Sequence, residues 1–329
     1  MTLRWAIMGT GRIADAVVQA LLAEGHTCVA VGSGNPGRAA AFAARYGIPH
    51  HGAHHDVLGH QPDAVYVATT NERHHLDALA CIEAGVPALV EKPFALDAAL
   101  ASHVLDRARE RGVFVMEAMW MLVQPGYLEA RRRIETGDIG EVRLVTADFG
   151  INVGGDPERA DPTRRWLARE QGGGALLDVG IYPLTLAISV LGPPRELLAL
   201  GELGTTGVDV NVGAAMRHAT GMSSWSCSYV ADSGVEATIA GSAGSLRLHG
   251  SFNNPPAVSR RRLDETLETL PIADAALGYR HEVREVARCL DAALTESPAV
   301  PHEHTLTVMR CLDELRTQLG VTYNGPGQP

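Results

Sequence analysis

A lysine stands where a strand should end at a ligand site, and an aspartate and a tyrosine are spaced as a possible proton-handling pair. Lys92 lies in Ala88-Leu89-Val90-Glu91-Lys92-Pro93, where a short apolar run ends abruptly in charged residues. A buried strand cannot hold Glu91 and Lys92 in its core. We therefore expect both at the carboxyl-terminal end of the strand, where ligands bind in open α/β sheets.

Asp178 and Tyr182 lie in an apolar helix that opens at Gly172-Gly173-Gly174. Their i, i+4 spacing predicts that a carboxylate and a phenol project from one face. Such a pair could handle a proton. Alternatively, Asp178 satisfies backbone N–H groups in the first turns while Tyr182 lies at the edge of the core, and the spacing does not decide between the two.

The start of the chain predicts a nucleotide-binding turn. Residues 3–8 are apolar, Gly9-Thr10-Gly11-Arg12-Ile13-Ala14 follows at once, and apolar residues then recur at helical spacing. Gly9 allows the tight turn, Gly11 lets the backbone approach a pyrophosphate, and Ala14 permits close helix–strand packing. The phosphates are expected at the helix N-terminus. The alternative is a glycine-rich turn without a ligand.

No acidic residue stands at the end of the second predicted strand, residues 27–31, where an NAD-binding chain usually places Asp or Glu on the ribose diol, and the next acid is Asp56. The strand runs into Gly32-Ser33-Gly34-Asn35. Ser33 could hydrogen-bond a 2′-phosphate and Arg38 could pair with it, although Arg38 could equally be a solvated helix residue. The sequence therefore favours NADP, with NAD as the alternative because Asn35 could bind an unphosphorylated ribose.

Strands and helices alternate through residues 1–121. Further strands are predicted at 64–68, 88–90 and 113–116, and further helices at 35–46, 74–84 and 97–111. Short strands in this alternation with helices indicate a parallel sheet with right-handed crossovers. We therefore expect residues 1–121 to form a dinucleotide-binding Rossmann domain.

Residues 122–329 predict a second, α/β domain with a mostly antiparallel sheet. A helix at 125–136 precedes strand candidates at 141–149, 196–203, 209–216, 222–230, 235–240 and 245–248, and helices at 281–294 and 302–319 follow. The alternation in residues 224–230 indicates one buried and one wetter sheet face.

Histidines form two groups with different expectations. His50, His51, His54, His55 and His60 lack a surrounding set of carboxylate or cysteine ligands, so a solvated loop and no metal site are expected. By contrast, His74 follows Thr69-Thr70-Asn71 at the end of another strand, which places it on the ligand-binding edge of the sheet.

Bulk properties narrow the class of protein. The chain has 329 residues and a formal net charge of −10, which argues against nucleic-acid binding. Its five cysteines form no CxxC pair and indicate free thiols in a reducing compartment. No apolar run approaches the roughly 18 residues of a membrane span. A soluble, cytoplasmic protein without membrane partners is expected.

The order of motifs resembles the glucose–fructose oxidoreductase / inositol dehydrogenase (Gfo/Idh/MocA) family. The resemblance rests on the turn at residues 9–14, Glu91-Lys92-Pro93, Glu117-Ala118-Met119-Trp120 and residues 172–183, and it extends to Tyr279-Arg280-His281-Glu282. The nearest branch contains dimeric dihydrodiol dehydrogenases and NADP-dependent D-xylose 1-dehydrogenases. The resemblance implies a Rossmann domain, then a substrate-binding α/β domain with a large open sheet through which homodimers or homotetramers form.

The resemblance also implies a site. Lys92 matches the family's catalytic lysine at the nicotinamide, Tyr182 the tyrosine that exchanges a proton with the substrate oxygen, and Asp178 the carboxylate on a neighbouring hydroxyl. A nearby ammonium would lower the pKa of the phenol. The substrate is expected to contact Lys92, Trp120, Arg165, Asp178 and Tyr182. The cofactor is expected to contact Gly9, Thr10, Gly11, Arg12, Ile13, Ser33, Arg38, Thr69, Asn71, His74, Glu91 and Lys92.

The sequence departs from the family pattern at three places. Thr70 stands where the family often has Pro, Gly34 follows Ser33 where Arg is frequent, and Met121-Leu122-Val123 replaces a common Thr-Arg-Phe. The first and third changes bear on the substrate, and the second weakens the preference for NADP. Pro93 is expected to turn the chain off its strand, with a cis bond as one option.

The expected function is NADP-dependent hydride transfer at a CH–OH or carbonyl carbon of an aldopyranose or a cyclic trans-diol. One alternative is reduction of a nucleotide-linked keto-sugar. Another is a non-catalytic NAD(P)-binding regulator on the same fold, since fold alone does not give function. The joint presence of Lys92, Asp178 and Tyr182 favours an enzyme, because a pure sensor has no need of all three.

Overall fold

Two compact units make up the chain. The computed structural model describes residues 2–153, 164–262 and 267–323. One unit comprises Met1–Trp120 and Tyr279–Leu306, and the other comprises Met121–Gly278 and Thr307–Pro329. The division predicted at residues 121/122 therefore differs at Tyr279–Leu306, which packs with the first unit.

Helix α7 (Arg280–Asp291) accounts for this difference, because it lies against α1 (Arg12–Ala23). Arg280 and Arg284 on α7 both pair with Glu24 just after α1, the latter at 2.8 Å between Nε and Oε2. A helix far along the sequence thus completes the first unit.

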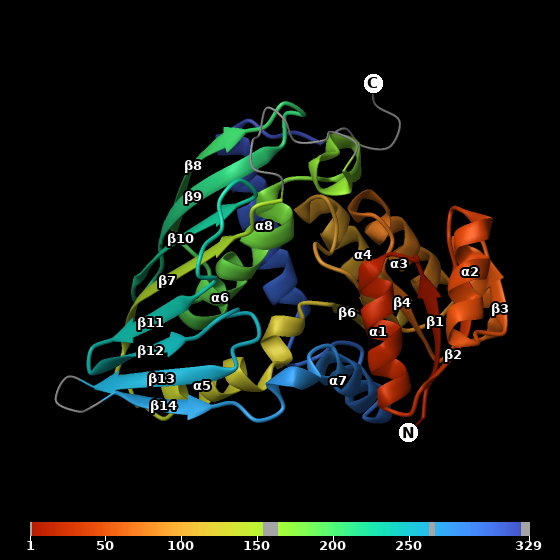
Figure 1. Cartoon of the computed structure of the whole chain (residues 1–329), viewed down its shortest axis with the longest axis horizontal. Helices are drawn as coiled ribbons and strands as arrows, with labels where there is room; N and C mark the ends of the chain where they lie inside the picture. The colour runs from red at the N-terminus through yellow and green to blue at the C-terminus, as the bar shows by residue number, and fades with distance from the viewer. Residues whose placement is uncertain (1, 154–163, 263–266, 324–329) are drawn as a thin grey trace. The chain divides into compact units, whose positions relative to one another are not determined.

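The first unit contains a parallel six-stranded sheet with the order β3-β2-β1-β4-β5-β6 (Figure 1). Its strands are β1 (Arg4–Met8), β2 (Thr27–Gly32), β3 (His50–Gly52), β4 (Ala64–Val67), β5 (Ala88–Val90) and β6 (Val115–Glu117). The strand order reverses between β1 and β4, and ligands of such sheets bind beside this switch point at the carboxyl ends of the strands. The predicted parallel α/β fold is confirmed.

The helices that alternate with these strands include α1, α2 (Pro36–Tyr46), α3 (His74–Glu83) and α4 (Ala98–Arg111). Capping residues in the sequence mark where several of them begin and end. The side chains of Asn35 and Asp97 accept the backbone N–H groups of Arg38 and Leu100 at 3.0 and 2.7 Å. Gly47 and Gly112 end α2 and α4 in the left-handed conformation, as their positions predict.

The histidine-rich stretch is structured, and the expectation of a solvated loop was wrong for part of it. His50–Gly52 is the edge strand β3, paired with β2. His54–His60 forms the short helix η1, which packs against β1, β2 and β3. The strand is only three residues long and its two histidines are exposed, so it lacks the apolar alternation that identifies strands in a sequence.

The second unit contains an eight-stranded sheet with the order β14-β13-β12-β11-β7-β10-β9-β8. Its strands are β7 (Val142–Gly150), β8 (Glu196–Leu203), β9 (Asp209–Arg217), β10 (Met222–Ser228), β11 (Ala237–Gly241), β12 (Gly244–Leu248), β13 (Ala257–Arg262) and β14 (Glu268–Pro271). Only β7 and β10 pair in parallel, so the predicted mostly antiparallel sheet is confirmed. The sequence did not identify β13 and β14, which are short and mostly polar.

Helix α6 (Ile181–Leu191) packs on β7 and β10, and α5 (Pro125–Glu135) packs on β12 and β13. The segment Arg169–Leu191 has the length and hydropathy of a membrane span, yet 83% of its most apolar window is buried inside the protein. Its apolar character therefore fits a core helix. Helix α8 (His302–Leu319) contributes residues to both units.

Two glycines of the β1–α1 turn give a matched test of the fold. Gly9 has φ +110°, and a Cβ there would lie 2.2 Å from the Ala68 carbonyl oxygen, whereas a Cβ at Gly11 meets nothing within 4 Å. Gly9→Ala should lower the free energy of unfolding by at least the roughly 1–3 kcal/mol that a strained backbone costs. Gly11→Ala should unfold like wild type in thermal denaturation, and equal losses in both variants would contradict this geometry.

Candidate functional site

The β1–α1 turn is shaped to approach an anion closely. The Gly9 N–H donates to Gly32 O at 2.8 Å, and Gly11 caps α1 in an extended conformation. No side chain caps this helix end. Open space above Gly11 and unsatisfied N–H groups at the start of α1 suit a phosphate. Thr10 and Ile13 are partly exposed beside the turn, and Arg12 is exposed.

The end of β2 lies next to this turn. The Ser33 hydroxyl is nearly buried, accepts the Asn35 N–H at 3.3 Å and lies 3.4 Å from Thr10 Oγ1. Arg38 is exposed on α2. His54 of η1 accepts the Gly34 N–H at 3.0 Å through Nε2, and burial lowers the pKa of this imidazole. The histidine stretch therefore helps to hold the β2 turn, which sequence reasoning missed.

The residues that follow β4 form a hydrogen-bonded layer around a buried carboxylate. Asp77 on α3 is fully buried and accepts the Thr69 hydroxyl at 2.7 Å, His55 at 2.8 Å and Arg73 at 2.8 Å. Burial alone would raise the pKa of Asp77, but these donors lower it. Among the described residues, no group of three or more His, Cys, Asp or Glu side chains is arranged to hold a metal.

His74 links two strand ends. Its Nδ1 lies 2.8 Å from the Pro93 carbonyl oxygen and its Nε2 lies 3.3 Å from the Thr69 carbonyl oxygen. Both ring nitrogens thus face the main chain, which indicates that His74 positions these strand ends. Asn71, another predicted cofactor contact, begins the short helix η2 (Asn71–Arg73) between them.

Glu91 and Lys92 leave the end of β5 as predicted, and the Lys92–Pro93 bond is cis. Glu91 is nearly buried, and its carboxylate accepts the Tyr66 hydroxyl from β4 and the Lys92 N–H at 3.1 Å. Lys92 is partly exposed. Its backbone is thus tied to a carboxylate that a second strand holds in place.

Glu117 ends the neighbouring strand β6 and is also buried. It accepts the Phe94 N–H at 3.2 Å and the Thr305 hydroxyl at 2.8 Å. Burial raises the pKa of Glu117 to about 7, although these two bonds and the positive charge of Lys92 oppose the rise. Trp120 begins the short helix η3 (Trp120–Val123) and stacks on Tyr279 with ring centroids 4.7 Å apart.

In the second unit, the glycine turn leads into a π-helical turn at Leu176–Gly180 and then into α6. The prediction that Asp178 and Tyr182 share one face assumed regular α-helical spacing, which this π turn interrupts. π turns inside helices are frequent at functional sites. Asp178 accepts the hydroxyl of buried Tyr229 at 2.6 Å, so its carboxylate has a side-chain donor from another element.

Tyr182 is fixed by packing on the same sheet. Its ring stacks on Phe149 of β7 at 5.4 Å between centroids, and 7% of the residue is exposed. Gly180 lets the helix approach β10 closely, because a Cβ there would lie 2.8 Å from the Cys227 sulfur. The close approach of helix and sheet brings Asp178 within reach of Tyr229.

Asp209 of β9 anchors the start of this helix. It is fully buried and accepts the Leu176 N–H at 2.5 Å, in the manner of an N-cap. Burial raises its pKa to about 6. Gly174, with φ +125°, is needed here, since a Cβ would lie 2.5 Å from the Asp209 carboxylate.

Arg165 lies in the exposed turn η4 (Arg165–Leu167), and the neighbouring Arg164 guanidinium lies 5.5 Å from the centre of the Trp166 ring. The predicted residues thus fall into groups. One edge of the first sheet carries Lys92, Glu91, His74 and Thr69. The β1–α1 turn and Ser33 lie at the ends of strands β1 and β2. Asp178 and Tyr182 share a helix in the second unit.

Sequence reasoning missed most of the residues that hold these groups: Tyr66, Asp77, Asp209, Tyr229 and Phe149. Each is a single residue within an apolar strand or helix pattern, and its partner lies elsewhere in the chain. Only Tyr229 had a signal, because it lies in the alternating stretch that predicts one buried face.

Two family models together match most of the chain. Residues 3–119 match an oxidoreductase family with an NAD-binding Rossmann fold, and residues 127–247 match the GFO/IDH/MocA C-terminal domain. The second match covers the segment with the glycine turn and most of the large sheet.

Known proteins extend this likeness over the full length. A trans-1,2-dihydrobenzene-1,2-diol dehydrogenase from Danio rerio is 32% identical and 100% of each chain is covered, and the human enzyme is 30% identical with 98% of each covered. The structure of a 3-ketoreductase from Actinomadura kijaniata with NADP and TDP-benzene has a TM-score of 0.84, 26% identity, and coverage of 97% of this chain and 98% of that one.

An aldose-aldose oxidoreductase from Caulobacter crescentus shares the fold at a TM-score of 0.86 and 22% identity, with 97% of each chain covered. The two family models, the full-length relatives and the fold agree with one another. The chain therefore belongs to the Gfo/Idh/MocA family of NAD(P)-binding oxidoreductases.

Proposed function

We propose that this protein is an NADP-dependent dehydrogenase or reductase that acts on a CH–OH or carbonyl carbon of an aldopyranose or a cyclic trans-diol. Two observations carry the proposal. Lys92 lies at the carboxyl end of β5, where parallel sheets of this kind bind cofactors. Asp178 lies in the π turn that precedes α6, Tyr182 lies in α6, and Asp209 anchors the start of this helical segment. The likeness to dihydrodiol dehydrogenases supports the substrate class.

The residues of the β1–α1 turn fit a dinucleotide. Gly9 is required by its φ of +110°, and Gly11 leaves room for a pyrophosphate above the N–H groups of α1. Ser33 and Arg38 would take a 2′-phosphate at the end of β2, where the residues after the strand include no acid to repel it. Thr69, Asn71, His74 and Glu91 would bind or position the cofactor along the strand ends. When bound, a nicotinamide accepts or donates the hydride.

Lys92, Tyr182 and Asp178 would carry the proton chemistry. In the oxidative direction Tyr182 would act as a phenolate, which takes the proton of the substrate hydroxyl and becomes a phenol as hydride leaves the carbon. The Lys92 ammonium stabilises negative charge on that oxygen. Asp178, held by Tyr229, binds a neighbouring hydroxyl, and Trp120 and Arg165 are the further substrate contacts we propose.

A second candidate activity is reduction of a keto-sugar linked to a nucleotide. It is favoured by the likeness to the 3-ketoreductase whose structure holds NADP and TDP-benzene. Solved structures of that enzyme include a tyrosine-to-phenylalanine and a lysine-to-alanine variant with the same ligands. The same residues of this chain would serve either activity, with the proton moving to the carbonyl oxygen in the reductive direction.

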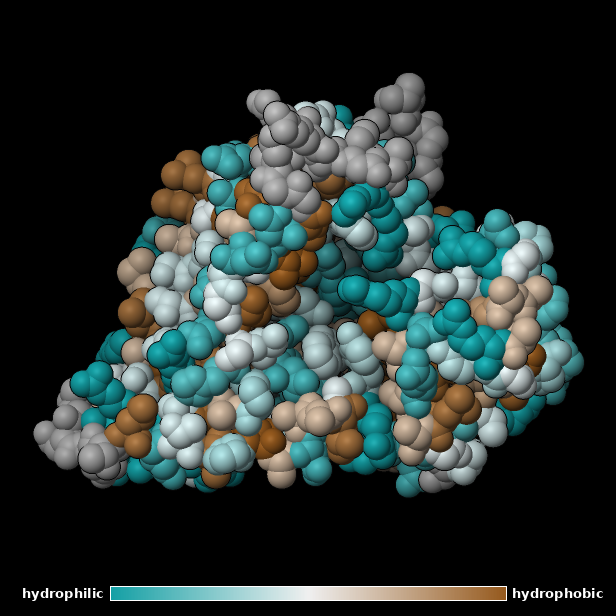
Figure 2. All heavy atoms as spheres, viewed as in Figure 1, coloured by the Kyte–Doolittle hydropathy of each residue, from teal (hydrophilic) through white to brown (hydrophobic). Residues whose placement is uncertain are grey.

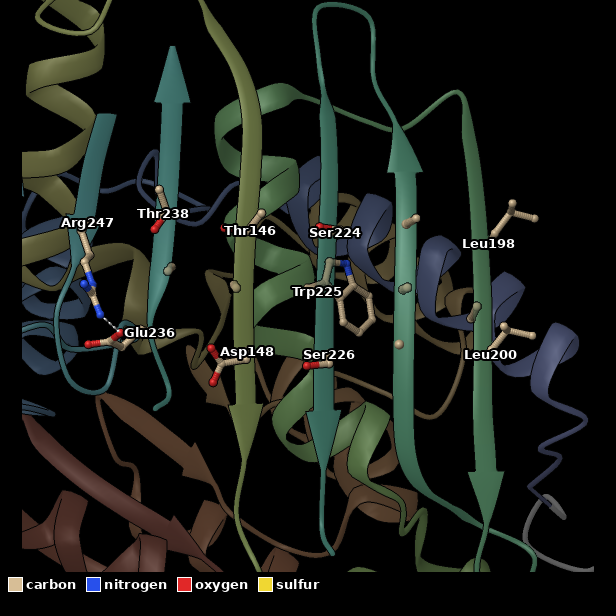
Figure 3. Close-up of a pocket in the computed structure, with 16 residues that line it drawn as sticks. Thr146, Asp148, Leu198, Leu200, Ser224, Trp225, Ser226, Glu236, Thr238 and Arg247 are labelled. Carbon is tan, nitrogen blue, oxygen red and sulfur yellow. Dashed lines mark hydrogen bonds and ion pairs between the residues drawn. The ribbon is translucent and has the colours of Figure 1, made fainter. Parts of the chain in front are cut away.

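We also propose that two copies of the chain associate through the outer face of the large sheet. This face lies opposite the helices and forms a shallow concavity, whose lining includes small residues such as Thr146, Ser224 and Ser226 and the ion pair of Arg247 with Glu236 (Figure 3). Leu198 and Leu200 on β8 are 71% and 85% exposed. Hydrophobic residues reach the surface over β8 in Figure 2. An exposed apolar sheet face of this kind typically marks a protein interface.

NADPH should bind more tightly than NADH in a fluorescence titration. Arg38→Ala should weaken NADPH binding about tenfold or more, the size of a lost charge-assisted hydrogen bond, and leave NADH binding unchanged. Arg45→Ala is the matched control, since Arg45 lies on the same helix and pairs with Asp15. Equal affinity for the two cofactors would overturn the assignment of Ser33 and Arg38.

Lys92→Met and Tyr182→Phe should each lower kcat by roughly 10²–10⁴, the usual contribution of general acid–base groups. Tyr182→Phe keeps the ring that stacks on Phe149, so the fold and NADPH binding should persist. Tyr46→Phe, in the first unit, is the control for loss of a phenol. The measurement is steady-state turnover on a substrate found by screening NADP⁺ reduction over aldopyranoses and cyclic trans-diols; near-full turnover in either variant would refute its role.

The double variant Leu198→Glu/Leu200→Glu should shift the protein to a smaller species in sedimentation velocity, because charge repulsion would replace apolar contact. Leu76→Glu is the control, since Leu76 is also exposed, at 40%, but lies on α3 of the first unit. An unchanged sedimentation coefficient in the β8 variant, or an equal shift in the control, would place the interface elsewhere.

A further inference from the structure

Glu282 on α7 is a carboxylic acid in an unusual setting. It is fully buried, and among the described residues neither carboxylate oxygen has a hydrogen-bond partner. It lies in the segment Tyr279-Arg280-His281-Glu282. No residue of this segment has a role in the cofactor binding or the proton transfer proposed above. A buried polar group without partners requires a physical explanation.

Protonation is the explanation that the setting allows. An ionised carboxylate that is buried without donors costs far more free energy than a neutral acid, so the group keeps its proton instead. Burial raises the pKa of Glu282 well above its ordinary value of 4.5, and the nearby charge of Glu91 raises it further.

Glu91 has the opposite setting although it is also buried. Its carboxylate receives the Tyr66 hydroxyl and the Lys92 N–H, and these donors favour the charged form. Burial, and after it the charge of Glu91, raise the pKa of Tyr66 well above its ordinary value, so the phenol stays a donor. Two neighbouring acids in different environments thus divide into one charged and one neutral group.

We propose that Glu282 is a neutral acid behind the Tyr66–Glu91 pair, and that this pair is the positioning device for Lys92. Because Glu282 keeps its proton, a single negative charge remains on Glu91, where Tyr66 fixes its direction. Glu91 in turn holds the backbone N–H of Lys92 at 3.1 Å. The functional half of this inference rests on the role proposed for Lys92, whereas the charge state of Glu282 does not.

The charge state can be measured through stability. Below pH 4.5 Glu282 is protonated in both folded and unfolded chains, so a glutamine there changes stability by a constant amount. Above that pH the unfolded chain releases the proton while the folded chain retains it, which destabilises wild type alone. The Tm difference between Glu282→Gln and wild type should therefore grow in favour of the variant between pH 5 and 8.

The other titratable and charged groups near Glu282 are the same in both proteins, so their contributions cancel in this comparison. They are Glu91 at the end of β5, Tyr66 on β4, Tyr279 at the start of α7, and Glu24 with Arg280 and Arg284 where α7 meets α1. Glu110→Gln, at an exposed position of α4 paired with Arg107, is the matched control and should show no such trend. A constant or shrinking difference in Glu282→Gln would overturn the neutral assignment.

Infrared difference spectra between wild type and Glu282→Gln give an independent readout. At pH 8, where Glu117 with its pKa of about 7 is mostly ionised, wild type should show the C=O stretch of a protonated carboxylic acid that the variant lacks. Absence of that band, in a variant that folds, would show that Glu282 is ionised.

The positioning role is tested with Tyr66→Phe and Glu91→Gln. Both should lower kcat at least tenfold. Tyr66→Phe, which is not among the proposed cofactor contacts, should also leave the NADPH dissociation constant within about threefold of wild type, which a general loss of structure would not do. Because Glu91→Gln keeps an acceptor for the Tyr66 hydroxyl, a lower kcat in this variant measures the contribution of the negative charge of Glu91. If Lys92→Met is inactive while these two variants turn over like wild type, this inference fails; if Lys92→Met is active, the proposed function fails.

Discussion

A carboxylate that leaves water needs hydrogen-bond donors or a proton, and this requirement shapes the candidate site in both units. Asp77 meets it with three side-chain donors, Glu91 with a buried tyrosine and a backbone N–H, and Asp178 with Tyr229. The side-chain donors belong to other elements than the carboxylates they serve, so these bonds also fix a strand end or a helix against its neighbour. The residues proposed to touch cofactor and substrate are thus held by buried polar contacts.

Much of the fold could be predicted from local patterns. Glycine and proline at element ends, caps such as Asp97, and apolar strands such as residues 88–90 specify structure within a few residues, and the structure agrees with them closely. The short strand β3 and the polar strands β13 and β14 could not be predicted in this way. Their pairing with a neighbour stabilises them, and their own composition does not identify them.

The residues of the candidate site likewise divide into those that local sequence patterns could predict and those that they could not. Lys92, Asp178 and Tyr182 carry their chemistry in their side chains and stand in recognisable motifs, so the sequence could nominate them. Tyr66 and Asp209 act through partners more than 20 residues away, at Glu91 and Leu176, and a single sequence carries no sign of such a pairing. The π turn at Leu176–Gly180 is likewise set by packing of the helix on the sheet.

The central proposal is that Lys92 and Tyr182 act in the same hydride-transfer step. The most direct measurement is kcat/KM for Lys92→Met, Tyr182→Phe and the double variant on one substrate with NADP⁺. Residues that act together show strongly non-additive losses. We expect the kcat/KM of the double variant to be little lower than that of the less active single variant. Losses that multiply, as for independent residues, would contradict it.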